Sequence, residues 1–191
     1  MKMTAQRFAS LVAGLSLAFV AAAQGTAPAS LSGSDTRFLQ HAAQDGLSEV
    51  QLGQLAQQKG LRDEVKQFAK RMVDDHTQAN QQLQSVAQAH GVQLPTGLDR
   101  KHERELKKLS DEKLLGPDFD RAYMSRMVSD HRKDVSEFRK RANAREQNDV
   151  TRFAAATLPV LVSHLDAARA TSDLAQASKR TGERQTGSSK P

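Results

Sequence analysis

The 191-residue sequence contains no cysteine, no tryptophan and only one tyrosine. Without cysteine, a disulfide framework, a thiolate metal site and a lipoprotein attachment cysteine are all excluded. Proline is scarce, with five residues, and no segment alternates apolar and polar residues as a half-buried strand does. These absences favour a helical protein whose chemistry depends on histidine and carboxylate side chains.

The only long apolar run lies at the N-terminus. Lys2 and Arg7 precede or open it, residues 8–23 are nearly all apolar or small, and residues 21–23 offer an A-x-A cleavage site. This pattern predicts a secretory signal peptide over residues 1–23. An uncleaved membrane anchor is the alternative, but the run is shorter than the ~20 residues that a spanning helix needs. We therefore expect a soluble protein that is periplasmic or secreted.

The charge of the chain is only mildly basic. The formal net charge is +6, and removal of the signal peptide leaves about +4. Residues 176–191 carry several of these basic groups and show no apolar periodicity, which predicts a disordered basic tail. The tail is either a solubilising end or a contact to the envelope surface. An export signal and the lack of a basic face with interleaved aromatics argue against nucleic-acid binding.

Four long segments repeat apolar residues at helical spacing. These segments are residues 34–59, 62–90, 117–144 and 149–175. A shorter, strongly charged helix is expected within residues 98–115, in the connector. Pro117 opens the third long helix, and Asn148 is a candidate N-cap for the fourth. We predict an all-α domain over residues 34–175, a ferritin-like four-helix bundle with one long crossover containing a short extra helix. A homodimer is compatible with this pattern.

One metal-competent side chain interrupts the apolar stripe of each long helix. These residues are Glu49, His76, His131 and His164. Helical bundles build metal sites from such inward-pointing side chains on facing helices. The other three histidines, His41, His90 and His102, fall off the stripes, at a helix end or in the charged connector, so we expect them at the surface.

An internal echo relates the two halves of the chain. Residues 71–76 and 126–131 agree in five of six positions, which indicates two related helical hairpins. We expect the two short turns at the same end of the bundle. At ~1.5 Å per residue, the three histidines then lie roughly 22–27 Å from those turns, in one layer. Asp45 matches this layer better than Glu49, and Asp134 shares the face of His131.

Several short motifs together resemble the exported bacterial domain-of-unknown-function family 4142. They are the segments Glu49–Ala56, Phe68–His76, Phe119–Tyr123 with His131, and Leu158–Leu165. The resemblance covers about Asp35 to Leu174 and implies a ferritin-like bundle. Members are often labelled outer-membrane proteins, but this sequence has neither a strand pattern nor a second long apolar segment. The resemblance brings no biochemical function with it.

The sequence departs from the pattern of di-iron ferritins. Those sites use a Glu-x-x-His motif on two helices and a glutamate on each of the other two. Here Val73, Val128 and Leu161 stand three residues before the three stripe histidines. No nucleophile motif is present either, so we predict no enzyme. A histidine-rich site would suit one zinc, copper or nickel ion, or one iron with a carboxylate.

Two interpretations follow. In the first, the protein has a structural or stress-related role in the cell envelope, and its histidines and carboxylates form a buried hydrogen-bonded network. In the second, it binds a transition metal with the three stripe histidines and Asp45 or Glu49, Asp134 being a further candidate. Because protons and metal compete for imidazole, we expect metal binding to weaken sharply as the pH falls from about 7 to 5.

Overall fold

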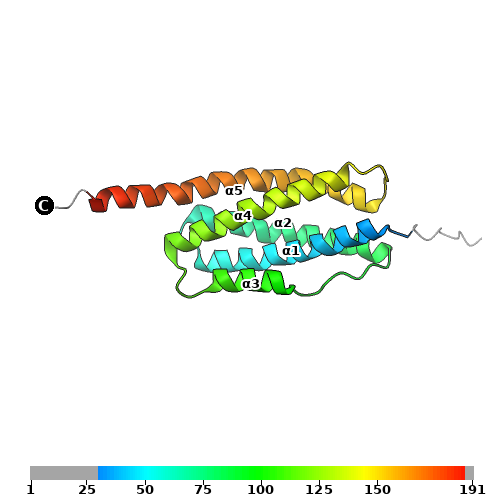
Figure 1. Cartoon of the computed structure of the whole chain (residues 1–191), viewed down its shortest axis with the longest axis horizontal. Helices are drawn as coiled ribbons and strands as arrows, with labels where there is room; N and C mark the ends of the chain where they lie inside the picture. Colours follow the sequence, from blue (N-terminus) through cyan, green and yellow to red (C-terminus); the bar gives the residue numbers. More distant parts are fainter. Residues whose placement is uncertain (1–29, 188–191) are drawn as a thin grey trace, which may run out of the picture.

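The computed structural model describes residues 30–187, with side chains described through residue 177. It contains five helices: α1 (Gly33–Lys59), α2 (Asp63–Ala89), α3 (Arg100–Ser110), α4 (Gly116–Ala142) and α5 (Asp149–Gly187). Figure 1 shows α1, α2, α4 and α5 side by side, with α3 along the outside. The all-α prediction is confirmed, since the described residues form no strand. The predicted signal peptide lies outside the described residues, and no described helix is long and apolar enough to span a membrane.

The four long helices close into a ring. α1 packs on α2, α2 on α5, α5 on α4, and α4 on α1, while α3 packs on α1 and α4. The Lys59 Nζ atom at the end of α1 donates a hydrogen bond to the Leu109 carbonyl near the end of α3, at 3.3 Å. The connector with α3 therefore returns the chain along the bundle before α4 begins. This is the predicted long crossover, and it makes α2 and α4 parallel.

The two short turns lie at opposite ends of the bundle (Figure 1). The backbone N–H groups of Leu61 and Arg62, in the α1–α2 turn, donate to the Asp120 carboxylate near the start of α4, at 2.9 and 3.0 Å. Asn148, before α5, donates to the Asp35 carboxylate at the start of α1, at 3.1 Å. Our expectation of turns at the same end was wrong, because the crossover inverts the second hairpin. The three histidines still meet. His76 and His131 lie near the midpoints of their helices, each 27 residues long, so inverting the second hairpin leaves them at the same level.

α5 ends at Gly187 instead of near Ala175. Residues 176–187, which we predicted to be part of a disordered tail, therefore continue the helix. This segment contains no proline, and most of its residues have fair helix propensity. Extending an existing helix adds one hydrogen bond for each residue fixed, so the extension needs no new nucleus. Residues 188–191 lie outside the described residues.

Two apolar cores occupy opposite ends of the bundle. The first contains Leu52, Ala56, Val65, Phe68, Met72, Phe119, Tyr123, Met124 and Met127, among others. The second contains Leu39, Ala43, Leu83, Ala87, Val135, Phe138, Val150, Phe153 and Leu161, among others. Glu49, His76, His131 and Asp134 fall between these two sets along their helices and are buried. The bundle therefore has a polar layer between two apolar cores.

Candidate metal centre

Three histidines meet in the polar layer. His76 comes from α2, His131 from α4 and His164 from α5, and their side chains are buried. Their ring centroids are 5.3–5.6 Å apart. One ring nitrogen from each histidine lies within 4.8 Å of the other two, and no second group of this kind was found among residues 30–187. The sequence-predicted histidines are thus brought together, whereas their role as metal ligands stays a prediction.

The backbone fixes the tautomer of His131. Its Nδ1 atom lies 2.9 Å from the carbonyl oxygen of Met127, one helical turn earlier. Because a carbonyl oxygen only accepts, Nδ1–H must donate, and the lone pair of the ring resides on Nε2. That Nε2 atom is buried and has no hydrogen-bond partner.

A carboxylate fixes the tautomer of His164. The Nε2 atom lies 2.7 Å from an Asp75 carboxylate oxygen, which also accepts from Arg71 Nε at 3.2 Å. Burial raises the pKa of Asp75, but the His164 hydrogen bond and the neighbouring charges outweigh it and lower the pKa below its usual value. Asp75 is therefore an ionised acceptor and His164 Nε2–H the donor. The lone pair is left on Nδ1, which is buried without a partner, as is Nε2 of His76.

Burial keeps the three rings neutral. It lowers the pKa of His131 to about 4, with a further contribution from the nearby His164. Burial lowers the pKa of His76 well below its ordinary value, and His131 and His164 lower it further. The pKa of His164 is lowered by burial more than its bond to Asp75 raises it. All three imidazoles can therefore offer lone pairs at neutral pH.

The three predicted carboxylate ligands do not join the histidine group. Asp45 faces His102 Nε2 at 3.1 Å and Lys133 Nζ at 3.5 Å, so both of its oxygens have partners. Glu49 is buried, and burial together with the charges of neighbouring aspartates raises its pKa well above the usual value. The pKa of Asp134 is raised well above normal for the same reasons. These two carboxyl groups hold protons more tightly than ordinary ones.

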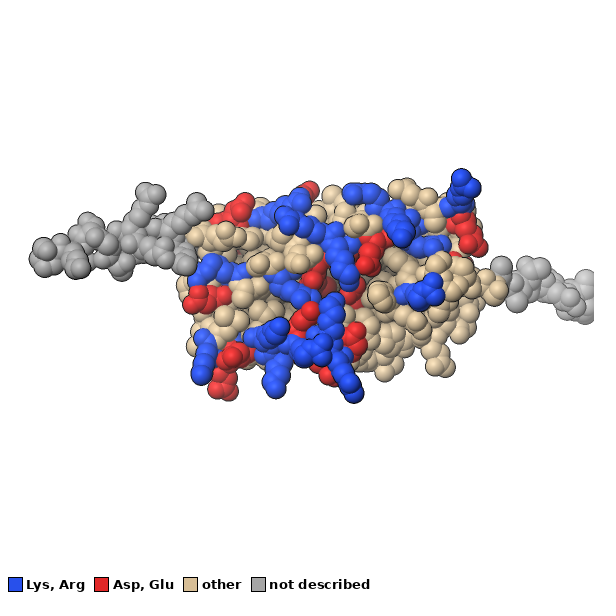
Figure 2. Space-filling model, viewed as in Figure 1, with Lys and Arg blue, Asp and Glu red and all other residues tan. Residues whose placement is uncertain are grey.

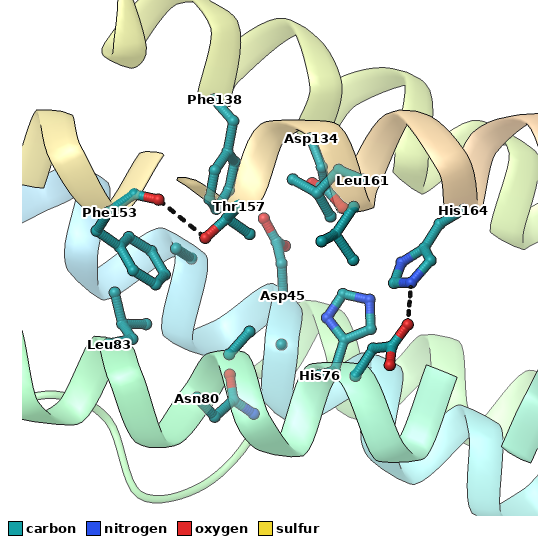
Figure 3. A pocket seen from close by; sticks show the side chains of 15 residues that line it. Asp45, His76, Asn80, Leu83, Asp134, Phe138, Phe153, Thr157, Leu161 and His164 are labelled. Carbon is teal, nitrogen blue, oxygen red and sulfur yellow. Dashed lines mark hydrogen bonds and ion pairs between the residues drawn. The ribbon is translucent and has the colours of Figure 1, made fainter. Parts of the chain in front are cut away.

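A small cavity adjoins the histidines. Its volume is ≈ 30 Å³, and its wall includes His76, His164, Asp45 and Asp134. Figure 3 shows the rings of His76 and His164 at one side of this space, with Leu161 and the phenylalanines beyond them. The other labelled lining residues are Asn80, Leu83, Phe138, Phe153 and Thr157. The histidine group therefore borders a mostly apolar hollow.

The family described as "Domain of unknown function (DUF4142)" matches residues 20–171. The chain belongs to this family. Among solved structures, the crystal structure of a DUF305 fragment from Deinococcus radiodurans is similar, with a TM-score of 0.65 and 15% identity. The match covers 78% of this chain and 99% of that chain. At this identity the likeness shows a shared fold and nothing about function. No curated protein matches the chain.

Sequence reasoning missed several polar interactions in this DUF4142 chain. His102 is buried, with Nδ1 2.9 Å from Asp99 and Nε2 facing Asp45, so its expected surface position was wrong. Asp75 was seen only at the edge of the α2 stripe, and its contact with His164 was not foreseen. The edge of the apolar face of a helix lies next to a neighbouring helix. A charged residue at such an edge can therefore be assigned a partner only when the position of the neighbouring helix is known.

The surface over α3 is charged but mixed in sign. Figure 2 shows blue basic side chains gathered with red acidic ones along the lower face, where α3 lies in Figure 1. His90, the residue that follows α2, was also expected at the surface, but its side chain is only 4% exposed and its Nε2 atom lies 2.9 Å from an Asp149 carboxylate oxygen. The view offers no wide face of a single sign.

Proposed function

We propose that this DUF4142 protein binds one transition-metal ion in the periplasm. The ligand atoms are Nε2 of His76, Nε2 of His131 and Nδ1 of His164. One observation carries the proposal: these three buried nitrogens lack any hydrogen-bond partner, and the three residues that bear them approach one another in a single cluster. Buried polar atoms in native proteins are rarely left unpaired without a ligand, water or catalytic role.

The alternative is a structural protein of the envelope with a buried hydrogen-bonded network. Such a network requires bonds between its members, because each unsatisfied buried group costs about 1–3 kcal/mol. His131 and His164 bond outward, to Met127 and Asp75. In the part of the chain that the structure describes, no hydrogen bond joins the three rings to one another. The arrangement therefore suits an ion better than a self-contained network.

The outward bonds support metal binding directly. Histidine ligands commonly donate their second ring N–H to a carboxylate or a backbone carbonyl, which fixes the tautomer and raises ligand basicity. Asp75 and the Met127 carbonyl oxygen occupy these two roles here. Each partner thus leaves the lone pair on the ring nitrogen that has no hydrogen-bond partner.

The spacing fits an ion after a small adjustment. With metal–nitrogen bonds of about 2.0–2.1 Å, two nitrogens of a tetrahedral site lie about 3.4 Å apart. The cluster spacing of up to 4.8 Å closes to this value if each ring moves inward by about 1 Å. Imidazole ligands suit zinc, copper, nickel and iron, so the donor set names this class and no single member. The periplasmic location is supported by the predicted signal peptide.

Metal analysis of untagged protein from its own periplasm tests the proposal. We expect about one equivalent of transition metal, and titration of the metal-free protein by calorimetry should give one site. His131→Leu should abolish uptake at that site. His41→Leu is the matched control, because His41 is exposed and is not part of the cluster. Equal uptake by both variants, or none by the wild type, would overturn the proposal.

A further inference from the structure

The histidine cluster supplies three protein ligands, one fewer than a tetrahedral ion takes. Structural zinc sites are closed by four protein ligands, whereas sites that act on small molecules keep one position open. No carboxylate oxygen belongs to the cluster, and both oxygens of Asp45 already have partners. An ion held by the three nitrogens therefore has a coordination position that no described side chain fills.

The cavity adjoins this position. His76 and His164 form part of its wall, so an ion between the rings would border it. A water molecule needs about 10–15 Å³ of such volume, and the cavity of ≈ 30 Å³ therefore accommodates a ligand of two or three heavy atoms. The apolar part of its wall includes Leu83, Phe138 and Leu161 (Figure 3). The small volume of the cavity excludes larger hydrated species.

Charge balance favours an anion. A divalent ion on three neutral imidazoles brings two positive charges into a buried site, and buried charge is costly unless it is paired. The negative charge of Asp75 is already paired with Arg71, and Asp45 in the cavity wall is paired with Lys133. Burial raises the pKa of Asp134, the third carboxyl group of the wall, and so favours its neutral form. The charge of the ion therefore stays uncompensated, and a monovalent anion bound to it would lower that charge.

We propose that the metal centre binds a small monovalent anion of two or three heavy atoms in this cavity, directly on the ion. The inference rests on the proposed metal site and adds its ligand. A surface groove between α2 and α5 adjoins the cavity, since the two share Asp75, Ala79, Thr157 and Val160 in their walls, and we assign the entry of the anion to this side. The groove has a volume of ≈ 310 Å³. The four shared residues form the boundary between the two spaces, which we call the neck, and Ala79 has the smallest side chain among them.

Azide added to the cobalt(II)- or copper(II)-loaded protein tests the inference. Azide is a linear monovalent anion of three heavy atoms, and direct ligation changes the visible spectrum of either ion. We expect a saturable spectral change with one azide per bound metal. If the metal is bound stoichiometrically and azide leaves both spectra unchanged, the inference fails and the metal site stands. If neither ion binds, the proposed function fails and the inference with it.

A matched pair of variants separates ligation in the cavity from binding elsewhere. Ala79→Leu narrows the neck, whereas Ala156→Leu places the same side chain in the groove but outside the cavity wall. We expect both variants to bind the metal, and only Ala79→Leu to weaken azide binding, by at least tenfold. Val160→Phe is a second blocking variant at a 40% exposed position, where a larger side chain is tolerated. Unchanged azide affinity in both blocking variants would overturn the cavity assignment.

Discussion

The polar layer consists of two halves built around the same six-residue motif. The histidine half contains Arg71, Asp75 and His76 of α2 with His164 of α5. The acid half contains Arg126, Asp130 and His131 of α4 with Glu49 of α1. Each half has an ion pair between its arginine and its aspartate. The halves differ in the residue on the adjacent helix, which is a histidine in one and a glutamate in the other.

The pKa values of the two aspartates shift in opposite directions. In the histidine half, the bond from His164 helps to lower the pKa of Asp75. In the acid half, burial raises the pKa of Asp130 despite the opposing effect of Arg126. Arg126 is shared with Glu105 of α3, at 2.5 Å. The motif alone therefore does not determine the chemistry, which depends on the neighbouring helix and on the cover that α3 provides.

We expect the largest effect on metal affinity when the residue on the adjacent helix is made a glutamate in both halves. His164→Glu places a carboxyl group opposite Asp75, as Glu49 stands near Asp130. We expect metal affinity to fall by on the order of 100-fold or more, because a ligand is lost and Asp75 loses its donor. Glu49→Gln is the control and should leave the affinity within about threefold. Calorimetric titration measures the metal affinity of both variants. A strong loss of affinity in Glu49→Gln would show that the acid half takes part in metal binding, which would contradict the proposed ligand set.

Replacing each of the two equivalent aspartates with asparagine tests the comparison, because the side chain keeps its shape and loses its charge. Asp75→Asn removes the negative acceptor that orients His164, and loss of such outer partners typically costs 10–100-fold in metal affinity. Asp130→Asn changes the matching position in the acid half, where no histidine of the cluster is bonded, and should leave the affinity unchanged. Similar losses in both variants would show that net charge, and not orientation, governs binding.

The pH dependence of metal binding distinguishes this buried site from an exposed one. Three histidines of ordinary pKa would lose affinity by about 10⁴-fold between pH 7 and 5 through proton competition. Because burial lowers the pKa of His131 to about 4, and those of His76 and His164 also lie below their ordinary value, we expect a loss below about tenfold. This replaces our sequence-based expectation of a sharp loss. Competition titrations at both pH values provide the measurement.

His131 and Glu49, which both belong to the acid half, should make opposite contributions to the pH dependence of stability in the metal-free protein. His131 binds protons more readily when unfolded, so stability falls as the pH drops from about 6.5 toward 4. Glu49 binds its proton more tightly when folded, so stability falls as the pH rises above 4.5 through the raised pKa. Glu49→Gln should therefore gain on the order of 1–2 kcal/mol over wild type at pH 7.5. Urea unfolding at several pH values tests this, and a constant difference between the two proteins would contradict it.

The sequence was most informative where one residue interrupts a long periodic stripe. His76, His131 and His164 could be placed inside their helices because the period identifies the buried face. The direction of the second hairpin could not be read from the sequence, because it depends on whether the connector returns along the bundle. Asp75 and His102 were missed for a related reason: both lie at the margins of a helix face, and only the position of the next helix gives them partners.

The two apolar cores on either side of the polar layer have a mechanical consequence. Polar groups gain less from burial than the apolar side chains above and below them, so we expect the layer to contribute less than either core to holding the helices together in the metal-free protein. An ion on the three histidines would join α2, α4 and α5 at this level, whereas α1 would contribute no ligand. We therefore expect the metal-bound bundle to unfold as a single unit, and the two cores of the metal-free bundle to be less strongly coupled through the polar layer.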